Sequence, residues 1–375
     1  MSFLIPSLAA VFLPVLALGP VPRHIAFIMD GNRRWATSHQ TDIRTGHFSG
    51  FQALKRVLES CLALEGLECI TVYAFAIDNF KRSREEVDAL MDLASSRLIE
   101  LASHGQVIAR HCVRVRIIGR IELLPDHVQA AVRKVEDMTK DNDKALLNIC
   151  IPYASRDEMA AAVRSTLADR LERRLQDAQQ PLHHIPNGNG SLQRPPTDAS
   201  SSSSSSFSSS YDLINSPPSA QDPISPTELD EHMMFTHSPP LDLLVRTSGV
   251  RRLSDFMLWQ ASNANTTLCF VDCYWPQFGL RHLVPILLNY QRAVWARDRQ
   301  RDGRVGASRR VPGLRDLSAA AAADSGEGGT RASSHRRQSR STKSRRPRPF
   351  VLLLFVASLL LLASHLLFGL HWTRR

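Results

Sequence analysis

Three short polar clusters in the chain carry side chains that suit the binding of anionic groups. They occupy residues 30–35, 78–82 and 246–254. Together they contribute several guanidinium groups, small residues that leave backbone N–H groups accessible, and few carboxylates. This inventory fits diphosphate groups together with one hard cation. Any one cluster alone is more typical of a solvated loop, so the prediction depends on the three meeting in space.

The clusters follow apolar runs that are typical of buried strands. Six such runs are predicted, at residues 24–29, 70–76, 113–118, 146–153, 241–245 and 268–274. Helical patterns separate most of them, as at 51–64 and 86–101, where apolar residues keep to one face. This alternation predicts an α/β fold with a central, mostly parallel six-stranded sheet flanked by helices. Because ligands bind outside the carboxyl ends of such strands, we expect the clusters to converge at one edge.

Composition divides the 375-residue chain into a folded domain and several segments of different character. The domain is predicted over 21–300, after an apolar N-terminal segment at 1–20. It is interrupted at 169–228 by a serine-rich insertion whose composition cannot bury enough apolar surface to fold. A basic low-complexity linker follows at 301–349 and leads to a hydrophobic run at 350–370.

The run at 350–370 is predicted to be one C-terminal transmembrane helix. Its about 21 residues include His365 as the only titratable group and suffice to cross the ~30 Å hydrocarbon layer. We expect it to insert after translation as a tail anchor, with the folded domain in the cytosol. The segment at 1–20 contains Pro6 and Pro14 and no basic residue before its apolar part. We interpret it as a segment resting on the membrane or at a tunnel mouth rather than as a signal peptide.

The net charge of +10 is concentrated at residues 331–348, next to the predicted anchor. Basic residues in that position are expected to contact anionic lipid, each contributing on the order of 1 kcal/mol. A membrane-tethered RNA-binding protein is an alternative, but the segment lacks aromatic residues between its basic ones. We therefore expect no nucleic-acid partner. The six cysteines are scattered without a C-x-x-C pair, which argues against a zinc site or a disulfide scaffold.

Long motifs around the three clusters resemble those of the cis-prenyltransferases, and most closely those of eukaryotic dehydrodolichyl diphosphate synthases. They are HIAFIMDGNRRWA at 24–36, GH at 46–47, YAFAIDNFKRSREEV at 73–87 and DLLVRTSGVRRLSDFMLWQ at 242–260. The resemblance implies a hydrophobic product tunnel beside the sheet. It also implies condensation of isopentenyl diphosphate with an allylic diphosphate such as farnesyl diphosphate. The product would be a long-chain polyprenyl diphosphate for dolichol synthesis and protein glycosylation.

The resemblance also assigns roles in holding the allylic substrate. Asp30 matches the family aspartate that holds Mg²⁺ against a diphosphate, and a helix cap is the alternative interpretation. The allylic diphosphate would be bound by Gly31, Asn32, Arg33, Arg34 and His47.

For isopentenyl diphosphate, the matching binding positions are Arg246, Arg252 and Ser254, whereas Arg251 has no match and is interpreted as a surface charge. Phe75, Asn79 and Arg82 fall where the family orients this substrate and the leaving diphosphate. Phe75 is equally compatible with a tunnel wall.

Two further features remain open at this point. Glu86 completes a capping box with Ser83, so it is either a helix cap or a site residue. Trp35, Trp259 and Trp275 are interpreted as core residues rather than catalytic ones.

Several positions depart from the family pattern. Ala76 stands where serine is common, Asp78 where glutamate is common, Val250 where glutamate is usual and Arg120 where an aspartate is expected. The C-terminal R-x-G that completes single-subunit relatives is found only late, at 301–306. A partner subunit similar to the Nogo-B receptor is therefore expected to supply that arginine, with a homodimer as the alternative.

A non-catalytic accessory subunit of the same complex is the main rival interpretation. Such subunits usually lose the Asp-Gly-Asn turn and the arginine sites, and this chain keeps both. The resemblance further implies an endoplasmic reticulum membrane location, with the lipid droplet as an alternative.

Overall fold

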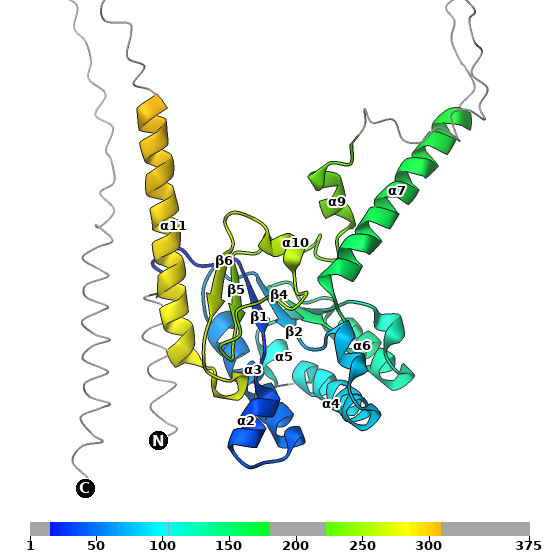
Figure 1. The fold of residues 1–375 in the computed structure, drawn as a ribbon, viewed down its shortest axis with the longest axis vertical. Coiled ribbons are helices and arrows are strands. Elements are labelled where there is room, and N and C mark those ends of the chain that lie inside the picture. Colours follow the sequence, from blue (N-terminus) through cyan, green and yellow to red (C-terminus); the bar gives the residue numbers. More distant parts are fainter. Residues whose placement is uncertain (1–15, 104, 180–222, 309–375) are drawn as a thin grey trace, which may run out of the picture. The chain divides into compact units, whose positions relative to one another are not determined.

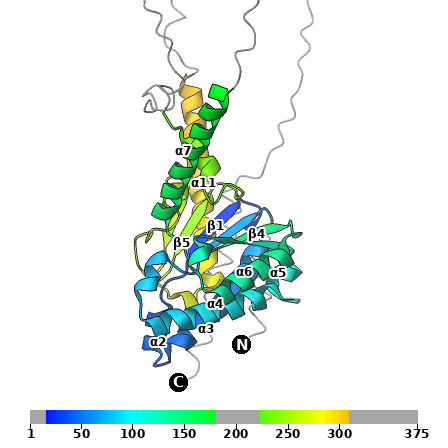
Figure 2. The same ribbon diagram turned by 90° about the vertical axis from the view of Figure 1, so that its right-hand side faces the viewer.

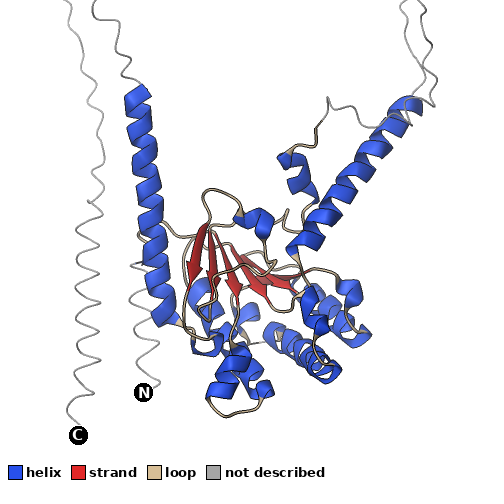
Figure 3. Cartoon of the chain, viewed as in Figure 1, coloured by secondary structure: helices blue, strands red, loops and turns tan. Residues whose placement is uncertain are grey.

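The computed structural model describes residues 16–103, 105–179 and 223–308, which form an α/β unit around one parallel sheet (Figures 1 and 3). The strand order is β3-β4-β2-β1-β5-β6, and every neighbouring pair is parallel. The strands are β1 (His24–Ile28), β2 (Cys69–Tyr73), β3 (Val113–Ile118), β4 (Ala145–Cys150), β5 (Leu243–Arg246) and β6 (Thr267–Phe270). The prediction of a six-stranded parallel sheet is therefore confirmed.

Helices connect these strands along the described chain. They are α2 (Asn32–Ser38), α3 (Ile43–Leu62), α4 (Arg84–Ala102), α5 (Val107–Arg110), α6 (Asp126–Thr139), α7 (Ser155–Gln179), α9 (Pro226–His232), α10 (Leu258–Ala261) and α11 (Leu280–Ser308). Three short 3-10 helices are η1 (Ile77–Lys81), η2 (Ile121–Leu123) and η3 (Trp275–Gln277).

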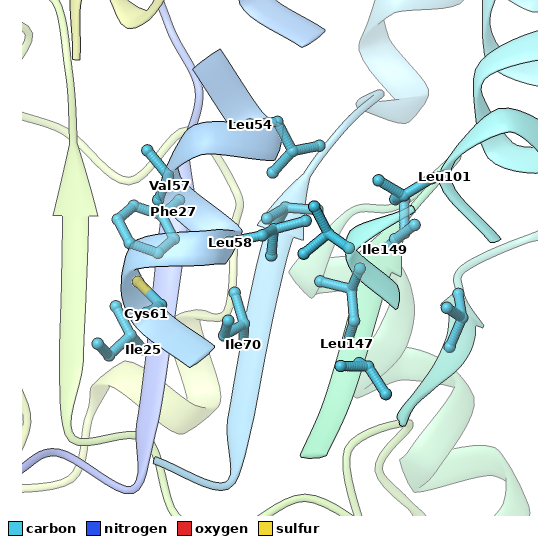
Figure 4. Close-up of a cluster of buried hydrophobic side chains, with 14 of the residues drawn as sticks. Ile25, Phe27, Leu54, Val57, Leu58, Cys61, Ile70, Leu101, Leu147 and Ile149 are labelled. Carbon is cyan, nitrogen blue, oxygen red and sulfur yellow. The ribbon is translucent and has the colours of Figure 1, made fainter. Parts of the chain in front are cut away.

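The sheet separates two apolar cores of unequal size. The larger core joins alternate strand residues such as Phe27 and Ile149 to side chains of α3, α4, α5, α6 and α11 (Figures 2 and 4). The smaller core lies on the opposite face, where Ile28 and Leu244 pack with Phe235 and Phe256. Strands covered on both faces explain the nearly continuous apolar runs in the sequence.

The strand order reverses between β1 and β5. The crossover from β1 to β2 passes through α3, which packs in the larger core, whereas Phe235, on the connection from β4 to β5, packs in the smaller core. In open α/β sheets a ligand crevice forms at such a switch point, beyond the carboxyl ends of the two strands. The first and third polar clusters of the sequence follow these two strands.

Two expected boundaries differ from the structure. Helix α7 continues to Gln179, past the expected start of the serine-rich insertion at 169, and α11 continues to Ser308, past the expected start of the linker at 301. In the part of the chain that the structure describes, no helix is long and apolar enough to span a membrane. The predicted transmembrane helix at 350–370 lies outside those residues.

The three tryptophans interpreted as core residues have different surroundings. Trp275 is only 1% exposed and packs against Phe27 and Phe278. Trp35 and Trp259 are half-buried, so the interpretation is wrong for these two. Trp35 stacks on His39 on the short helix α2, and the indole N–H of Trp259 donates to Asp230 at 2.5 Å. Each side chain therefore has a partner near the surface and does not enter either core.

Candidate active site

Asp30 and Arg246 form an ion pair at the switch point between β1 and β5. The Arg246 Nη2 atom lies 2.9 Å from Oδ2 of Asp30, and Arg34 Nη2 lies 3.3 Å from Oδ1. The Arg246 side chain is 5% exposed, whereas that of Asp30 is 29% exposed. The carboxylate thus lies between two guanidinium groups and still reaches solvent, where an anion and its counter-ion could approach.

The loop after β5 holds the Arg246 guanidinium from its other side. The Nη1 atom donates to Oγ of Ser254 at 2.7 Å and to the carbonyl oxygen of Arg252. Ser248 and Ser254 have positive φ values of 81° and 52°, a backbone conformation that non-glycine residues rarely adopt. Such conformations persist where surrounding contacts enforce them, commonly at ligand clamps. The Arg252 side chain itself is exposed.

Close packing positions the turn between β1 and α2. Gly31 has φ of +104°, and a Cβ there would lie 2.7 Å from the Tyr274 ring. Helix α3 approaches Asn32 so closely that a Cβ on Gly46 would lie 2.5 Å from the Asn32 carbonyl oxygen. A Cβ on Gly50 would lie 2.4 Å from Oδ1 of the same residue. These glycines bring the helix that carries His47 next to the turn that carries Asp30.

The second cluster joins the first through Glu86. Its carboxylate lies 2.9 Å from Arg82 Nη1 and 3.6 Å from Arg33 Nη1, and Arg82 Nη2 donates to Oδ1 of Asn79 at 2.9 Å. The Ser83 hydroxyl accepts the backbone N–H of Glu86 at 3.3 Å, which confirms the predicted cap of α4. Glu86 therefore serves both interpretations, because its N–H is capped while its side chain orients two arginines.

His47 lies on α3 beside these arginines. Burial lowers the pKa of its imidazole, the Arg82 and Arg33 charges lower it further, and Glu86 acts in the opposite direction. Its Nε2 atom is buried and has no hydrogen-bond partner among the described residues, as is also true of Oδ1 of Asn32 and Oγ of Ser248. Buried polar atoms are normally paired, so this set of atoms points to a polar ligand.

An apolar cavity of about 160 Å³ opens beside Asn32 and His47. It lies between the sheet and helices α3 and α4, and Figure 4 shows three of its lining residues, Leu54, Leu101 and Ile149. Phe75 is 3% exposed, lines the same cavity and packs edge-on against Phe80. Of the two interpretations of Phe75, the structure supports a place in the cavity wall.

Thr247 and Trp275 belong to the site although neither was singled out as a site residue from the sequence. The Thr247 hydroxyl accepts from the backbone N–H of Asp30 at 3.0 Å and donates to its carbonyl oxygen at 2.7 Å. The backbone N–H of Trp275 donates to that same carbonyl, and its indole N–H donates to the Gly50 carbonyl at 2.8 Å. The position of Thr247 directly after Arg246 was the available signal, whereas no sequence pattern indicated the Trp275 contacts.

The acidic residues of the site fit Mg²⁺ only in combination with a ligand. Among the residues that the structure describes, no group of three His, Cys, Asp or Glu side chains could hold a metal ion. Asp30 offers one partly exposed carboxylate. Mg²⁺ commonly binds through one or two carboxylates and takes its other ligands from phosphate oxygens and water. A single aspartate beside a diphosphate site satisfies that pattern.

Residues 28–300 match the family described as "Putative undecaprenyl diphosphate synthase". The chain is 37% identical to a dehydrodolichyl diphosphate synthase complex subunit of Schizosaccharomyces pombe, over 78% of this chain and 93% of that protein. It is 36% identical to dehydrodolichyl diphosphate synthase 6 of Arabidopsis thaliana, over 74% of this chain and 85% of that protein. The crystal structure of lavandulyl diphosphate synthase from Lavandula x intermedia with dimethylallyl diphosphate superposes with a TM-score of 0.54. That match has 25% identity and covers 72% of this chain and 95% of that one.

Proposed function

The chain belongs to the undecaprenyl diphosphate synthase family, and on this premise we propose that it is a cis-prenyltransferase that makes long-chain polyprenyl diphosphates for dolichol synthesis. It condenses isopentenyl diphosphate with an allylic diphosphate such as farnesyl diphosphate. The observation that carries this proposal is the Asp30–Arg246 pair at the switch point, beside an apolar cavity. A charged anion site next to an apolar cavity suits a substrate with a diphosphate head and a hydrocarbon tail.

The two sides of Asp30 would bind different diphosphates. The turn at Gly31 and Asn32, with Arg33, Arg34 and His47, would bind the allylic diphosphate at the cavity mouth. The loop after β5, with Arg246, Arg252 and Ser254, would bind isopentenyl diphosphate, and Arg82 with Asn79 would orient the reacting groups. Charge that develops on the departing diphosphate is then stabilised by guanidinium groups already fixed in position.

Asp30 would hold Mg²⁺, which when bound neutralises negative charge on the diphosphate that leaves. The lowered pKa of His47 keeps its imidazole neutral at pH 7, so it can donate one hydrogen bond to a phosphate oxygen. No other side chain in the described site presents an unpaired base, and the released diphosphate is the simplest acceptor for the proton lost from the isopentenyl group.

We further propose that a second subunit completes the site. The R-x-G sequences at 301–306 fall within α11, a helix, rather than in a loop beside the strand ends. The name of the Schizosaccharomyces pombe relative describes a complex subunit, which is consistent with this arrangement. A tail anchor at 350–370 in the endoplasmic reticulum membrane, with the catalytic domain in the cytosol, remains part of the proposal and is supported by the sequence alone.

The test is Mg²⁺-dependent incorporation of labelled isopentenyl diphosphate onto farnesyl diphosphate by the full chain in detergent. It is purified alone and after coexpression with a Nogo-B-receptor-like subunit. Asp30→Asn should abolish incorporation. Asp137→Asn should not change it, because Asp137 is an exposed carboxylate of α6 that pairs with Lys140 just beyond the end of the helix. Activity only with the partner supports a heteromer. Activity in neither preparation contradicts the enzyme assignment and supports an accessory subunit.

A further inference from the structure

The cavity beside the active site is small for its proposed role. At about 160 Å³ it resembles engineered cavities of about 150 Å³ that hold a molecule the size of benzene. A farnesyl group is larger than benzene, and a long polyprenyl chain is larger still. If the proposed function is right, on which this inference rests, one wall of the cavity must move as the product grows.

The walls of the cavity differ in how they are held. The strands β2 and β4 are joined by a continuous parallel ladder, and α4 packs broadly against α6. Helices α3 and α4 form the remaining wall, to which they contribute Phe51, Leu54, Leu90, Ala94 and Leu98. The contacts between these two helices include a cluster of charged and aromatic side chains. The seam between α3 and α4 is therefore the wall that can open without breaking backbone hydrogen bonds.

Five residues join the two helices across this seam, and we call them the clasp: Phe48, Phe51 and Lys55 on α3, and Arg97 and Glu100 on α4. Lys55 Nζ lies 3.0 Å from Oε1 of Glu100, and Arg97 also pairs with Glu100. The Arg97 guanidinium lies 5.0 Å from the Phe48 ring centroid and 5.4 Å from that of Phe51, within the range of cation–π attraction. Lys55 Nζ lies 5.3 Å from the Phe51 ring.

Two members of the clasp, Phe51 and Arg97, line the cavity, and Arg97 is the charged one. It lines a wall that is otherwise mostly apolar, and its Nε atom is buried without a hydrogen-bond partner among the described residues. Burial raises the pKa of Glu100, but hydrogen bonds from Arg97 and Lys55 lower it overall, so the carboxylate is charged at neutral pH and the clasp is ionic. A hydrocarbon chain that passes Arg97 must separate its guanidinium from the rings or bury the charge further, and both changes are unfavourable.

We propose that the clasp limits product length, because a growing polyprenyl chain must open the α3–α4 seam at Arg97 before it can extend further. Arg97 is then a specificity-determining residue for chain length. It does not contact the diphosphates, so replacing it should change product length more than the rate of the first condensation.

The test compares product lengths by reversed-phase chromatography for the full chain and three variants, each prepared with the partner subunit if one is needed. Arg97→Met keeps the length of the side chain and removes the charge, so the product distribution should shift to longer chains by one or more isoprene units. Arg97→Lys keeps the charge and should stay close to the wild type. Arg110→Met is the control, because it removes another arginine that pairs with α3, at 2.7 Å from Glu59. Neither Arg110 nor Glu59 lines the cavity, so this variant should leave product length unchanged.

A binding measurement separates failure of this inference from failure of the proposed function. Alkyl diphosphates from decyl to eicosyl are titrated calorimetrically into the full-length wild type and Arg97→Met, without turnover. A fully buried methylene improves affinity about fourfold. In the wild type this gain should stop at the chain length that reaches Arg97, and in Arg97→Met it should continue beyond it. The inference is overturned if the two proteins give the same dependence or bind no alkyl diphosphate, or if an active Arg97→Met makes products of unchanged length. If no preparation incorporates isopentenyl diphosphate but the titrations give the expected results, the outcome contradicts the proposed function and not the limit that Arg97 sets on the length of the bound chain.

Discussion

Arg246→Lys should lower kcat/KM for isopentenyl diphosphate by about 10- to 150-fold, because lysine cannot make both sets of contacts that this guanidinium makes. One side of the fork reaches Asp30 at 2.9 Å, and the other reaches Ser254 at 2.7 Å and the Arg252 carbonyl. A lysine ammonium is a single point charge and can keep only one side. Losing one hydrogen bond to a charged group costs about 1.5–3 kcal/mol, and this free energy corresponds to the loss of about 10- to 150-fold in kcat/KM.

The assay measures initial rates of labelled isopentenyl diphosphate incorporation while each substrate is varied in turn. KM for isopentenyl diphosphate should rise, while KM for farnesyl diphosphate should change less than about threefold, since the loop after β5 is assigned to the former. Arg251→Lys is the matched control, because this arginine lies in the same loop and its side chain is exposed. Urea unfolding of both variants shows how much of any loss comes from stability.

Two results would refute this reasoning. Arg246→Lys with kcat/KM close to the wild type would mean that the paired geometry of the guanidinium is not used by the substrate. Equal losses for Arg246→Lys and Arg251→Lys would mean that only the overall positive charge of the loop matters.

Two further predictions concern packing and pH. Gly46→Ala should lower the free energy of unfolding by about 1–3 kcal/mol and lower kcat, because its Cβ would meet the Asn32 carbonyl at 2.5 Å and push α3 away from the turn; unchanged urea unfolding and activity would contradict this. Burial lowers the pKa of His24 to about 4, although its hydrogen bond to Pro239 raises it. As the pH is lowered, His24 of the unfolded chain becomes protonated near pH 6.5, whereas His24 of the folded chain stays neutral until about pH 4. The free energy of unfolding therefore falls by about 3 kcal/mol as the pH drops through that window. Urea unfolding between pH 7 and 4 should show this slope in the wild type and a smaller one in His24→Gln, and equal slopes would exclude His24 as its source.

The sequence predicted the sheet well because its strands are covered on both faces. Fully buried strands such as β1 and β5 produce continuous apolar runs that need no partner to be recognised. The predicted ends were less accurate. The run at 146–153 stays apolar past Cys150, where β4 ends, because residues 151–153 are also buried, although Tyr153 pairs with Ala76 only in an isolated bridge outside the strand. Apolarity reports burial, and the better signal for the end of β4 was Pro152, which has no backbone N–H to continue the ladder.

Of the candidate site, the sequence predicted which residues converge but not how they are paired. The polar clusters after β1 and β5 had to meet once the strands were adjacent and parallel. That Glu86 joins Arg33 to Arg82, or that Trp275 connects Asp30 to α3, depends on side-chain geometry between residues far apart in the chain. The same holds for the clasp, whose members look like ordinary surface positions of two amphipathic helices.

The charges at the site supply a physical reason for a metal requirement. Among the described residues, the ion pairs of Arg33, Arg34, Arg82 and Arg246 involve two carboxylates, those of Asp30 and Glu86. These six groups carry a surplus of two positive charges, and Arg252, which is also assigned to the site, raises the surplus to three. Two bound diphosphates together carry more negative charge than this surplus can balance. A divalent cation on Asp30 reduces the mismatch at the point where the Arg246 and Arg34 guanidinium groups already meet. An arginine from a partner subunit would reduce the mismatch further, so the proposed metal ion and the proposed partner would both act by balancing the charge of the diphosphates.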